Sequence, residues 1–126
     1  MEEKLAEAEF ILDLFDALPD AITFLSPVFQ DDKIIDFNIT YVNATAAKFT
    51  GKIPLLMAGK NILEHKVPSV SSHRQVFEQS VEAYYSRDAI TSSYYNAFIS
   101  SEVTVTRYRY RNGVLTVSRS MKPIKA

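Results

Sequence analysis

Cysteine is absent from this chain of 126 residues, and glycine occurs only three times. The lack of cysteine excludes disulfides, thiolate metal sites, a cysteine nucleophile and any photochemistry that needs a cysteine adduct. Apolar runs are only a few residues long, far below the roughly 20 residues that span a bilayer, and the N-terminus is acidic rather than basic. We therefore expect a cytoplasmic protein without a signal peptide and without membrane insertion.

The composition indicates one globular domain. Hydrophobic residues make up 47% of the chain and charged residues 23%, as in ordinary folded proteins. A chain of this length can bury a core of its own without disulfides or metal. The net charge is −1, and no basic cluster with interleaved aromatic residues stands out, so nucleic acid is not an expected partner.

The two ends of the chain carry opposite charge. Residues 1–20 hold seven acidic side chains and one lysine, a net charge of −6, whereas residues 103–126 hold six basic side chains and no acidic one. Such charges attract one another, although two separately solvated faces explain the pattern equally well. Arg107, Arg109 and Arg111 alternate along one predicted strand. We expect them to hold the acidic first segment, with a bound anion as the alternative.

An amphipathic helix is predicted over residues 1–20, because apolar residues recur at steps of three and four and Pro19 then ends the pattern. Its apolar stripe would pack on the sheet or against the same helix of a second chain. We therefore expect a homodimer, with Leu5, Leu12 and Phe15 at the contact. Residues 21–126 would form the domain proper.

Five strands are predicted. Residues 21–25 form a short buried strand, and residues 34–42 alternate between apolar and polar positions, which leaves one wet face. Three further strands cover residues 89–95, 102–110 and 114–121. The last two are joined by Asn112-Gly113, a strong signal of a tight hairpin.

Short helices are predicted between the second and third strands. Asn43 would cap a helix over residues 44–49, which Gly51 ends. A second short helix over residues 55–58 would close with Gly59 in the left-handed conformation. A longer amphipathic helix follows Pro68 and runs to about Tyr84. The sequence thus predicts an α+β domain with a five-stranded antiparallel sheet, short helices and one long helix on one face, and an N-terminal amphipathic helix.

The order of elements and several segments resemble the PAS family of signalling domains across essentially the whole chain. The segments are Leu18–Ile22, Ile35–Asn43, Ala46-Ala47, Thr50-Gly51 and Gly59–Glu64. At the C-terminal exit, the Asp-Ile-Thr typical of many such domains is replaced by Ser120-Met121-Lys122. The resemblance implies a sheet wrapped against helices around a pocket that holds haem, flavin, a metabolite or only side chains.

The resemblance also implies a function. It suggests a non-catalytic sensory module that binds a small ligand or mediates dimerisation, and that relays a signal to an output domain such as a histidine kinase or a diguanylate cyclase. The alternatives are a PAS fold with a filled core that serves only dimerisation, and a small cone-shaped α+β enzyme or hydrophobic-ligand carrier. The expected pocket is lined by Phe24, Phe37, Ile39, Phe49, Ile62, His73, Phe77, Val105 and Val117.

His73 is the candidate for cofactor chemistry, because its place near the start of the long helix resembles that of the haem-ligating histidine of oxygen-sensing PAS domains. Relatives often carry a histidine there without haem, so the cofactor stays unassigned. The sequence lacks a Gly-rich phosphate loop, a His-Glu-x-x-His zinc pattern and a Gly-x-Ser-x-Gly nucleophile turn. Asp31, Asp32 and Asp36 fit a solvated turn and an exposed strand position better than a metal cluster. We expect neither catalytic nor metal-binding residues.

Overall fold

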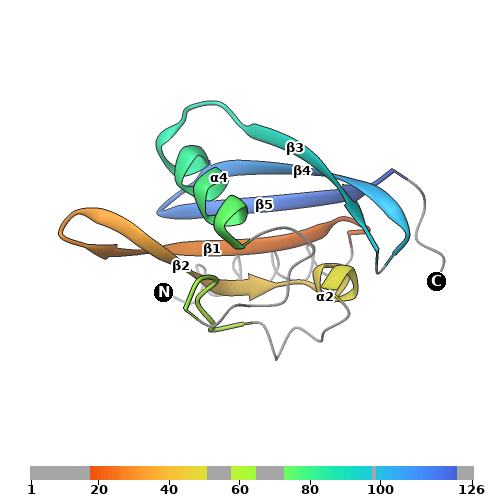
Figure 1. Ribbon diagram of the computed structural model, residues 1–126, viewed down its shortest axis with the longest axis horizontal. Helices are drawn as coiled ribbons and strands as arrows, with labels where there is room; N and C mark the ends of the chain where they lie inside the picture. The colour runs from red at the N-terminus through yellow and green to blue at the C-terminus, as the bar shows by residue number, and fades with distance from the viewer. Residues whose placement is uncertain (1–17, 51–57, 65–72, 98, 122–126) are drawn as a thin grey trace, which may run out of the picture.

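A twisted antiparallel sheet of five strands organises the fold (Figure 1). The computed structural model describes residues 18–50, 58–64, 73–97 and 99–121. The strand order across the sheet is β2-β1-β5-β4-β3, which confirms the predicted antiparallel α+β architecture. The elements are β1 (Ala21–Gln30), β2 (Lys33–Val42), α2 (Ala44–Thr50), α4 (His73–Tyr85), β3 (Ile90–Asn96), β4 (Ser101–Tyr110) and β5 (Gly113–Ser120).

Several predictions lie outside the described residues. They are the N-terminal helix with Leu5, Leu12 and Phe15, the residue Gly51, and most of the second short helix. Gly59 is described, and its φ of 85° confirms the predicted left-handed conformation. Within the described part of the chain, no helix is long and apolar enough to cross a membrane.

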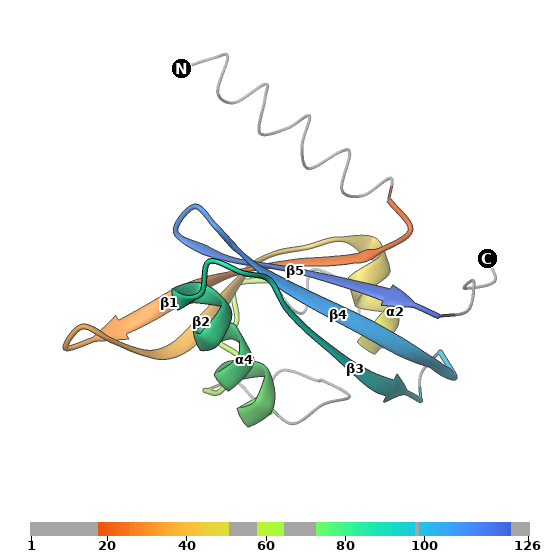
Figure 2. The ribbon, with the colours of Figure 1, turned by 90° about the horizontal axis from the view of Figure 1, so that it is seen from above.

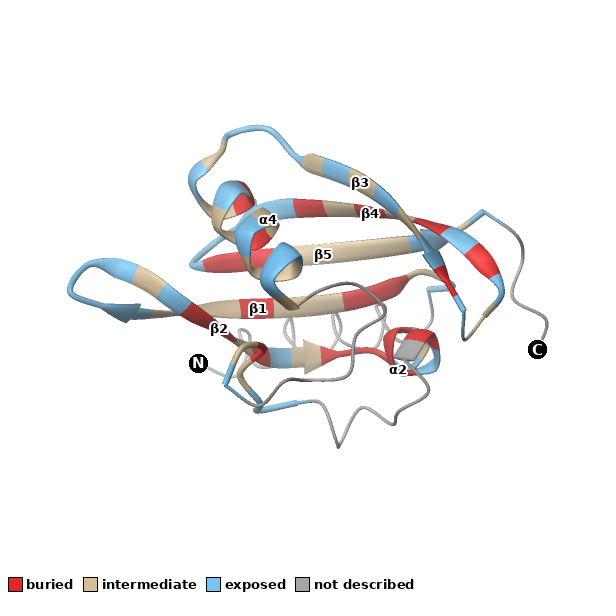
Figure 3. Cartoon of the chain, viewed as in Figure 1, coloured by how far each residue is buried: buried red, intermediate tan, exposed pale blue. Residues whose placement is uncertain are grey.

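One face of the sheet carries the helices and the core. Buried residues of α2 and α4 pack in a single cluster with inward residues of all the strands except β3, which contributes partly buried side chains (Figures 1 and 3). Phe37, Val103 and Val114 are its largest fully buried apolar side chains. Burying side chains of this size stabilises a fold by roughly 1.5–3 kcal/mol each. The long helix α4 crosses this face and contacts β2, β3, β4 and β5.

The hairpin of β1 and β2 is longer than the sequence predicts, because β1 continues to Gln30. Beyond Leu25, β1 has lost its pairing with β5 and is bonded to β2 alone. Pro27 is accommodated there, since a proline, which has no N–H to donate, is tolerated where one side of a strand is unpaired. Asp31 and Asp32 form the two-residue loop with φ of 52° and 63°, as a type I′ turn requires. Figure 2 shows this hairpin reaching past the rest of the sheet.

The predicted hairpin between β4 and β5 is present, with its loop one residue earlier than the Asn112-Gly113 signal suggests. Tyr110 pairs with Gly113, so Arg111 and Asn112 form the loop. Gly113 itself belongs to β5 and is required by close packing. A Cβ there would overlap the Leu25 carbonyl oxygen and would lie 2.6 Å from Cζ of Phe24.

The outer edge of β2 is occupied by the segment at residues 59–62. The Ile39 amide donates to the Lys60 carbonyl at 2.8 Å, and the Ile62 amide donates to the Phe37 carbonyl at 2.9 Å. The Asn38 side chain joins the same segment, donating to the Gly59 carbonyl at 2.9 Å. These bonds satisfy backbone groups that an edge strand would otherwise leave exposed.

The prediction of an exposed polar face on β2 is wrong at Asp36. Its side chain is buried, with 6% of the residue exposed. Its carboxylate accepts hydrogen bonds from the amides of Phe37 at 2.7 Å, Leu63 at 3.0 Å and Glu64 at 3.0 Å. The alternation of Asp36 with apolar neighbours did not reveal these amides, because two of them come from a segment 27 and 28 residues away.

Asn43 caps α2 as predicted and also fixes the start of β1. Its Oδ1 accepts from the Ala46 amide, the expected capping bond, and from the Ile22 amide, both at 2.9 Å. Its Nδ2 donates to the Asp20 carbonyl at 2.9 Å. The residue has no exposed surface, so these bonds replace those that water would otherwise make.

Candidate ligand-binding site

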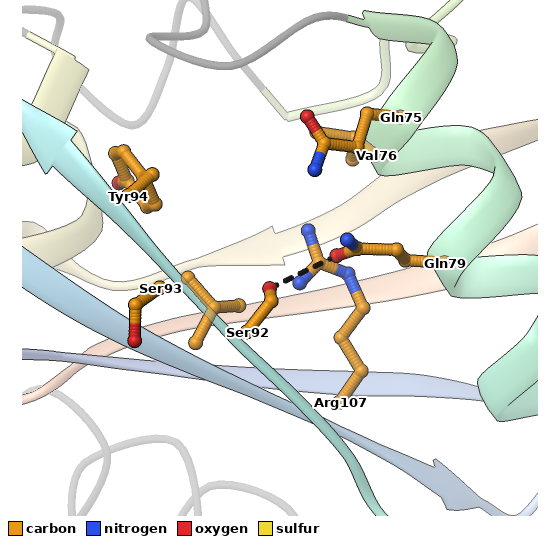
Figure 4. A pocket seen from close by; sticks show the side chains of 8 residues that line it. Gln75, Val76, Gln79, Ser92, Ser93, Tyr94 and Arg107 are labelled. Carbon is orange, nitrogen blue, oxygen red and sulfur yellow. Dashed lines mark hydrogen bonds between the residues drawn. The ribbon is translucent and has the colours of Figure 1, made fainter.

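A small cavity lies between α4 and the adjoining strands β3 and β4 (Figure 4). Its volume is about 20 Å³, room for about one water-sized group. Six of its eight lining residues have polar or charged side chains, so a purely hydrophobic ligand is not expected at this place. The lining residues are Gln75, Val76 and Gln79 from α4, Ser92, Ser93 and Tyr94 from β3, and Val105 and Arg107 from β4.

Arg107 is the principal charged group of the cavity. Only 5% of the residue is exposed, and its guanidinium points from β4 toward α4, beside Gln79 and Ser92 (Figure 4). No acceptor among the described residues lies in hydrogen-bonding range of its Nε or Nη1. The ion pairs Arg74–Glu78 and Arg119–Asp20 do not involve it. A buried cation without a counter-ion costs a protein several kcal/mol.

Arg107 keeps its positive charge at neutral pH. Burial lowers the pKa of its guanidinium from 12.5 to about 10, and the neighbouring Tyr94 acts weakly in the opposite direction. Burial also raises the pKa of Tyr94 above its ordinary value of 10, against smaller effects of Asn96 and Arg107. Tyr94 is therefore a neutral phenol near pH 7, and it does not neutralise the arginine.

The remaining polar groups around the cavity are partly oriented by the protein. Ser92 Oγ donates to Gln79 Oε1 at 3.1 Å, which turns the amide nitrogen of Gln79 away from Ser92. Asn96 Nδ2 donates to the Tyr94 hydroxyl at 3.4 Å, and the tyrosine keeps its own proton to donate. Thr116 is the cross-strand neighbour of Arg107, and its buried hydroxyl likewise has no partner among the described residues.

Asn96, at the end of β3, connects Tyr94 of this cavity to α2. It has no exposed surface, and its Nδ2 also donates to the Phe49 carbonyl at the end of α2, at 2.9 Å. Asn96 could not be recognised from the sequence, because its partner is 47 residues away. Arg107 was recognised only as part of a basic strand. The alternation of Val103 and Val105 with polar residues already places Arg107 on the buried side, and that is the signal that identifies it.

Of the three arginines predicted to alternate along one strand, two lie on β4, and most of the acidic segment that they were expected to hold lies outside the described residues. Arg107 and Arg109 share the face that carries α4, whereas Arg111 lies in the loop to β5. Arg109 stacks on the Tyr84 ring at 3.8 Å and donates to the Tyr84 carbonyl at 2.7 Å. One ion pair does join the two oppositely charged ends of the chain. Arg119 donates two hydrogen bonds, of 3.1 and 2.9 Å, to the carboxylate of Asp20.

Most of the predicted pocket residues belong to the buried core. Phe37, Ile39, Phe49, Ile62 and Val105 belong to the same buried cluster. Phe77 packs against it, with 5.9 Å between its ring centroid and that of Phe37. Of the residues predicted to line the pocket, Val105 is the one that also lines the α4 cavity.

Phe24 and Val117 lie on the opposite face of the sheet. Directly paired residues of antiparallel strands point to the same side, and Val117 pairs with Ile22, while Phe24 pairs with Leu115. Their neighbours Leu25 and Val114 are the ones in the core. The expected grouping of Phe24 and Val117 with the other pocket residues is therefore wrong, because the sequence did not reveal which strand face points inward.

His73 begins α4 and is partly exposed. It is not among the residues that line the α4 cavity. A search of the described residues finds no group of three or more histidine, aspartate or glutamate side chains close enough to hold a metal ion. Haem ligation by His73 thus gains no support from the geometry of this cavity.

Comparison with known proteins defines the fold and no more. No family model matches the chain, and no curated protein matches it. Among the solved structures, 31 chains match. They include a crystal structure of a C-terminal domain from Streptococcus mutans, with a TM-score of 0.59 and 22% sequence identity over 92% of this chain and 86% of that one. The chain therefore shares its α+β fold with proteins of known structure.

Proposed function

We propose that this domain is a non-catalytic sensory module of the PAS type, which binds a small ligand beneath α4 and relays binding to an output domain. The proposal assigns a ligand-binding role to the α4 cavity and a catalytic role to no residue. The order of elements and the sequence segments that resemble PAS domains support it. The structural observation that carries it is the buried, uncompensated charge of Arg107 in a polar cavity.

The position of the cavity is suited to signalling. Its walls come from both α4 and the hairpin of β3 and β4, so a ligand there would contact both the helix and the sheet. A ligand that prefers one arrangement of these two layers would shift an existing equilibrium toward it. β4 is bonded to β5, the last strand of the domain, which offers a direct route from the cavity to the C-terminal end.

The remaining parts of the proposal come from the sequence. The amphipathic segment over residues 1–20 would pair two copies of the chain, and the output domain would be of the histidine kinase or diguanylate cyclase type. A cytoplasmic location belongs to the same proposal. In this arrangement, the ligand changes the geometry of a homodimer, and the output domain responds to that geometry.

Changing Arg107 to methionine tests the relay without knowledge of the ligand. The substitution removes the charge that a bound ligand would neutralise, and so imitates the occupied cavity. Coupling between sites in proteins is commonly worth 5- to 150-fold in an equilibrium constant. We expect the dimer dissociation constant, measured by sedimentation equilibrium, to change by at least about fivefold.

Arg109→Met is the matched control, because Arg109 shares the strand and face of Arg107 but contacts Tyr84 instead of the cavity. This variant should leave the dimer dissociation constant within about twofold of the original. If Arg107→Met and Arg109→Met give the same dissociation constant as the unchanged protein, the cavity is not coupled to dimerisation and the proposed relay is wrong.

Leu12→Glu tests the role assigned to the N-terminal segment. A carboxylate in the centre of an apolar helix stripe would have to be desolvated on pairing, at a cost of several kcal/mol. We expect dimerisation to weaken by more than about 100-fold in sedimentation experiments. Glu9→Gln, on the predicted polar face, should change it little. Unaltered dimerisation of Leu12→Glu would remove this segment from the interface.

A further inference from the structure

We infer that the α4 cavity binds the carboxylate group of a small organic acid, with Arg107 as its counter-ion. The inference rests on the proposed ligand-binding function and names the chemical class of the ligand. It follows from the charge, the size and the lining of one cavity.

The charge of the cavity requires an anion. Arg107 is buried, and within the described chain its Nε and Nη1 have no hydrogen-bond partner. Its neighbour Tyr94 is a phenol and supplies no negative charge near pH 7. A neutral ligand would satisfy the N–H groups but would leave the buried charge unpaired, whereas an anion does both.

The size of the cavity favours a carboxylate over larger anions. A volume of about 20 Å³ suits one small group, and a planar carboxylate presents two oxygens to the planar guanidinium. A phosphate or sulfate group is tetrahedral and bulkier than a carboxylate, so it fits a cavity of this size less well. Val76 and Val105 supply the apolar part of the lining.

The lining supplies further donors for the carboxylate oxygens. The Gln79 amide oxygen is engaged by Ser92, which leaves the amide nitrogen of Gln79 as a donor (Figure 4). The Tyr94 hydroxyl accepts from Asn96 and retains its proton for donation. The residues that carry these two neutral donors and the guanidinium come from α4, β3 and β4 and line the same cavity.

Acetate is the simplest probe of this site. In thermal unfolding at constant ionic strength, replacing sodium chloride by sodium acetate should raise the Tm, by roughly 5 °C at ten times the Kd. Acetamide has the same shape without the charge and should have no effect. In two-dimensional NMR spectra of the arginine side chains, the Nε–H signal that is missing in Arg107→Met should shift with acetate and then saturate.

Three variants make the result specific. Arg107→Met should fold with a Tm no lower than that of the original protein, because it replaces a buried unpaired cation by an apolar chain of similar length. It should not respond to acetate. Arg109→Met should respond as the original protein does. Arg107→Lys keeps the charge but loses the planar fork, and it should bind acetate at least about tenfold more weakly.

The inference is overturned if acetate stabilises the protein no more than chloride does, or if Arg107→Met responds equally to acetate. Inorganic phosphate, tested in the same way, distinguishes failure of the carboxylate inference from failure of the proposed ligand-binding function. Stabilisation by phosphate that depends on Arg107 would leave the cavity a ligand site of another class. If the Arg107 signal moves with neither anion and Arg107→Met also leaves dimerisation unchanged, both proposals fail.

Discussion

Replacing Asn43 by alanine is expected to lower the free energy of unfolding by about 3–4 kcal/mol. The change would leave the amides of Ile22 and Ala46 and the carbonyl of Asp20 without their partner in a fully buried position. Each buried backbone group left unsatisfied costs about 1–3 kcal/mol, partly relieved when water enters. The loss also includes about 1 kcal/mol for the missing helix cap. Urea unfolding followed by circular dichroism measures it directly.

Thr45→Ala is the matched control, two residues further along the same helix. Its hydroxyl makes one long contact of 3.5 Å to the Leu18 carbonyl at an exposed site. We expect a change of less than about 0.5 kcal/mol. A loss below about 1 kcal/mol for Asn43→Ala would mean that the hydrogen bonds joining α2 to β1 contribute little to stability.

Replacing Asp36 by alanine is the second large effect, with an expected loss of about 3 kcal/mol in the free energy of unfolding. Three amides would lose their acceptor, and two of them, on Leu63 and Glu64, directly follow the segment at residues 59–62 that covers the edge of β2. Hydrogen bonds to a charged acceptor contribute roughly 1.5–3 kcal/mol each when the alternative is an unpaired group. Hydrogen exchange should show the damage first at the Leu63 and Glu64 amides, before the centre of the sheet is affected.

Asp36→Asn and Asp31→Asn complete this test. The first keeps one acceptor oxygen but turns an NH2 group toward an amide donor, so about half of the loss should remain. The second lies in the exposed loop at a φ of 52°, where asparagine is at least as well accommodated as aspartate. Its stability should change by less than about 0.5 kcal/mol. Equal stability of Asp36→Ala and the original protein would mean that Asp36 does not hold Leu63 and Glu64 beside β2.

Local patterns in the sequence predict most of the described fold. β2, β4 and β5 follow from alternating residues, the start of α2 follows from Asn43, and the last hairpin follows from its turn residues. These features depend on neighbours within a few residues. The end of β1 was missed because Pro27 suggests a break, and only the absence of β5 beside it makes the proline acceptable.

The candidate site was less predictable, because it depends on contacts between distant segments. The inward face of β1 and β5 is decided by their register, which places Leu25 and Val114 inside and Phe24 and Val117 outside. The sequence offered an anion for the arginines only as an alternative to the acidic first segment. Burial of Arg107 against α4, which no single segment reveals, is the observation on which the proposed anion site rests.

The occupied edge of β2 limits how copies of this domain can join through their sheets. A sheet with two open edges can add neighbours at both sides, and such growth has no natural end. Here the segment at residues 59–62 makes hydrogen bonds to backbone groups in the middle of β2. The other edge strand of the sheet is β3. Pairing through β3 alone joins two copies and then stops. By occupying those groups, the segment at residues 59–62 makes open-ended growth of the sheet through the middle of β2 unfavourable.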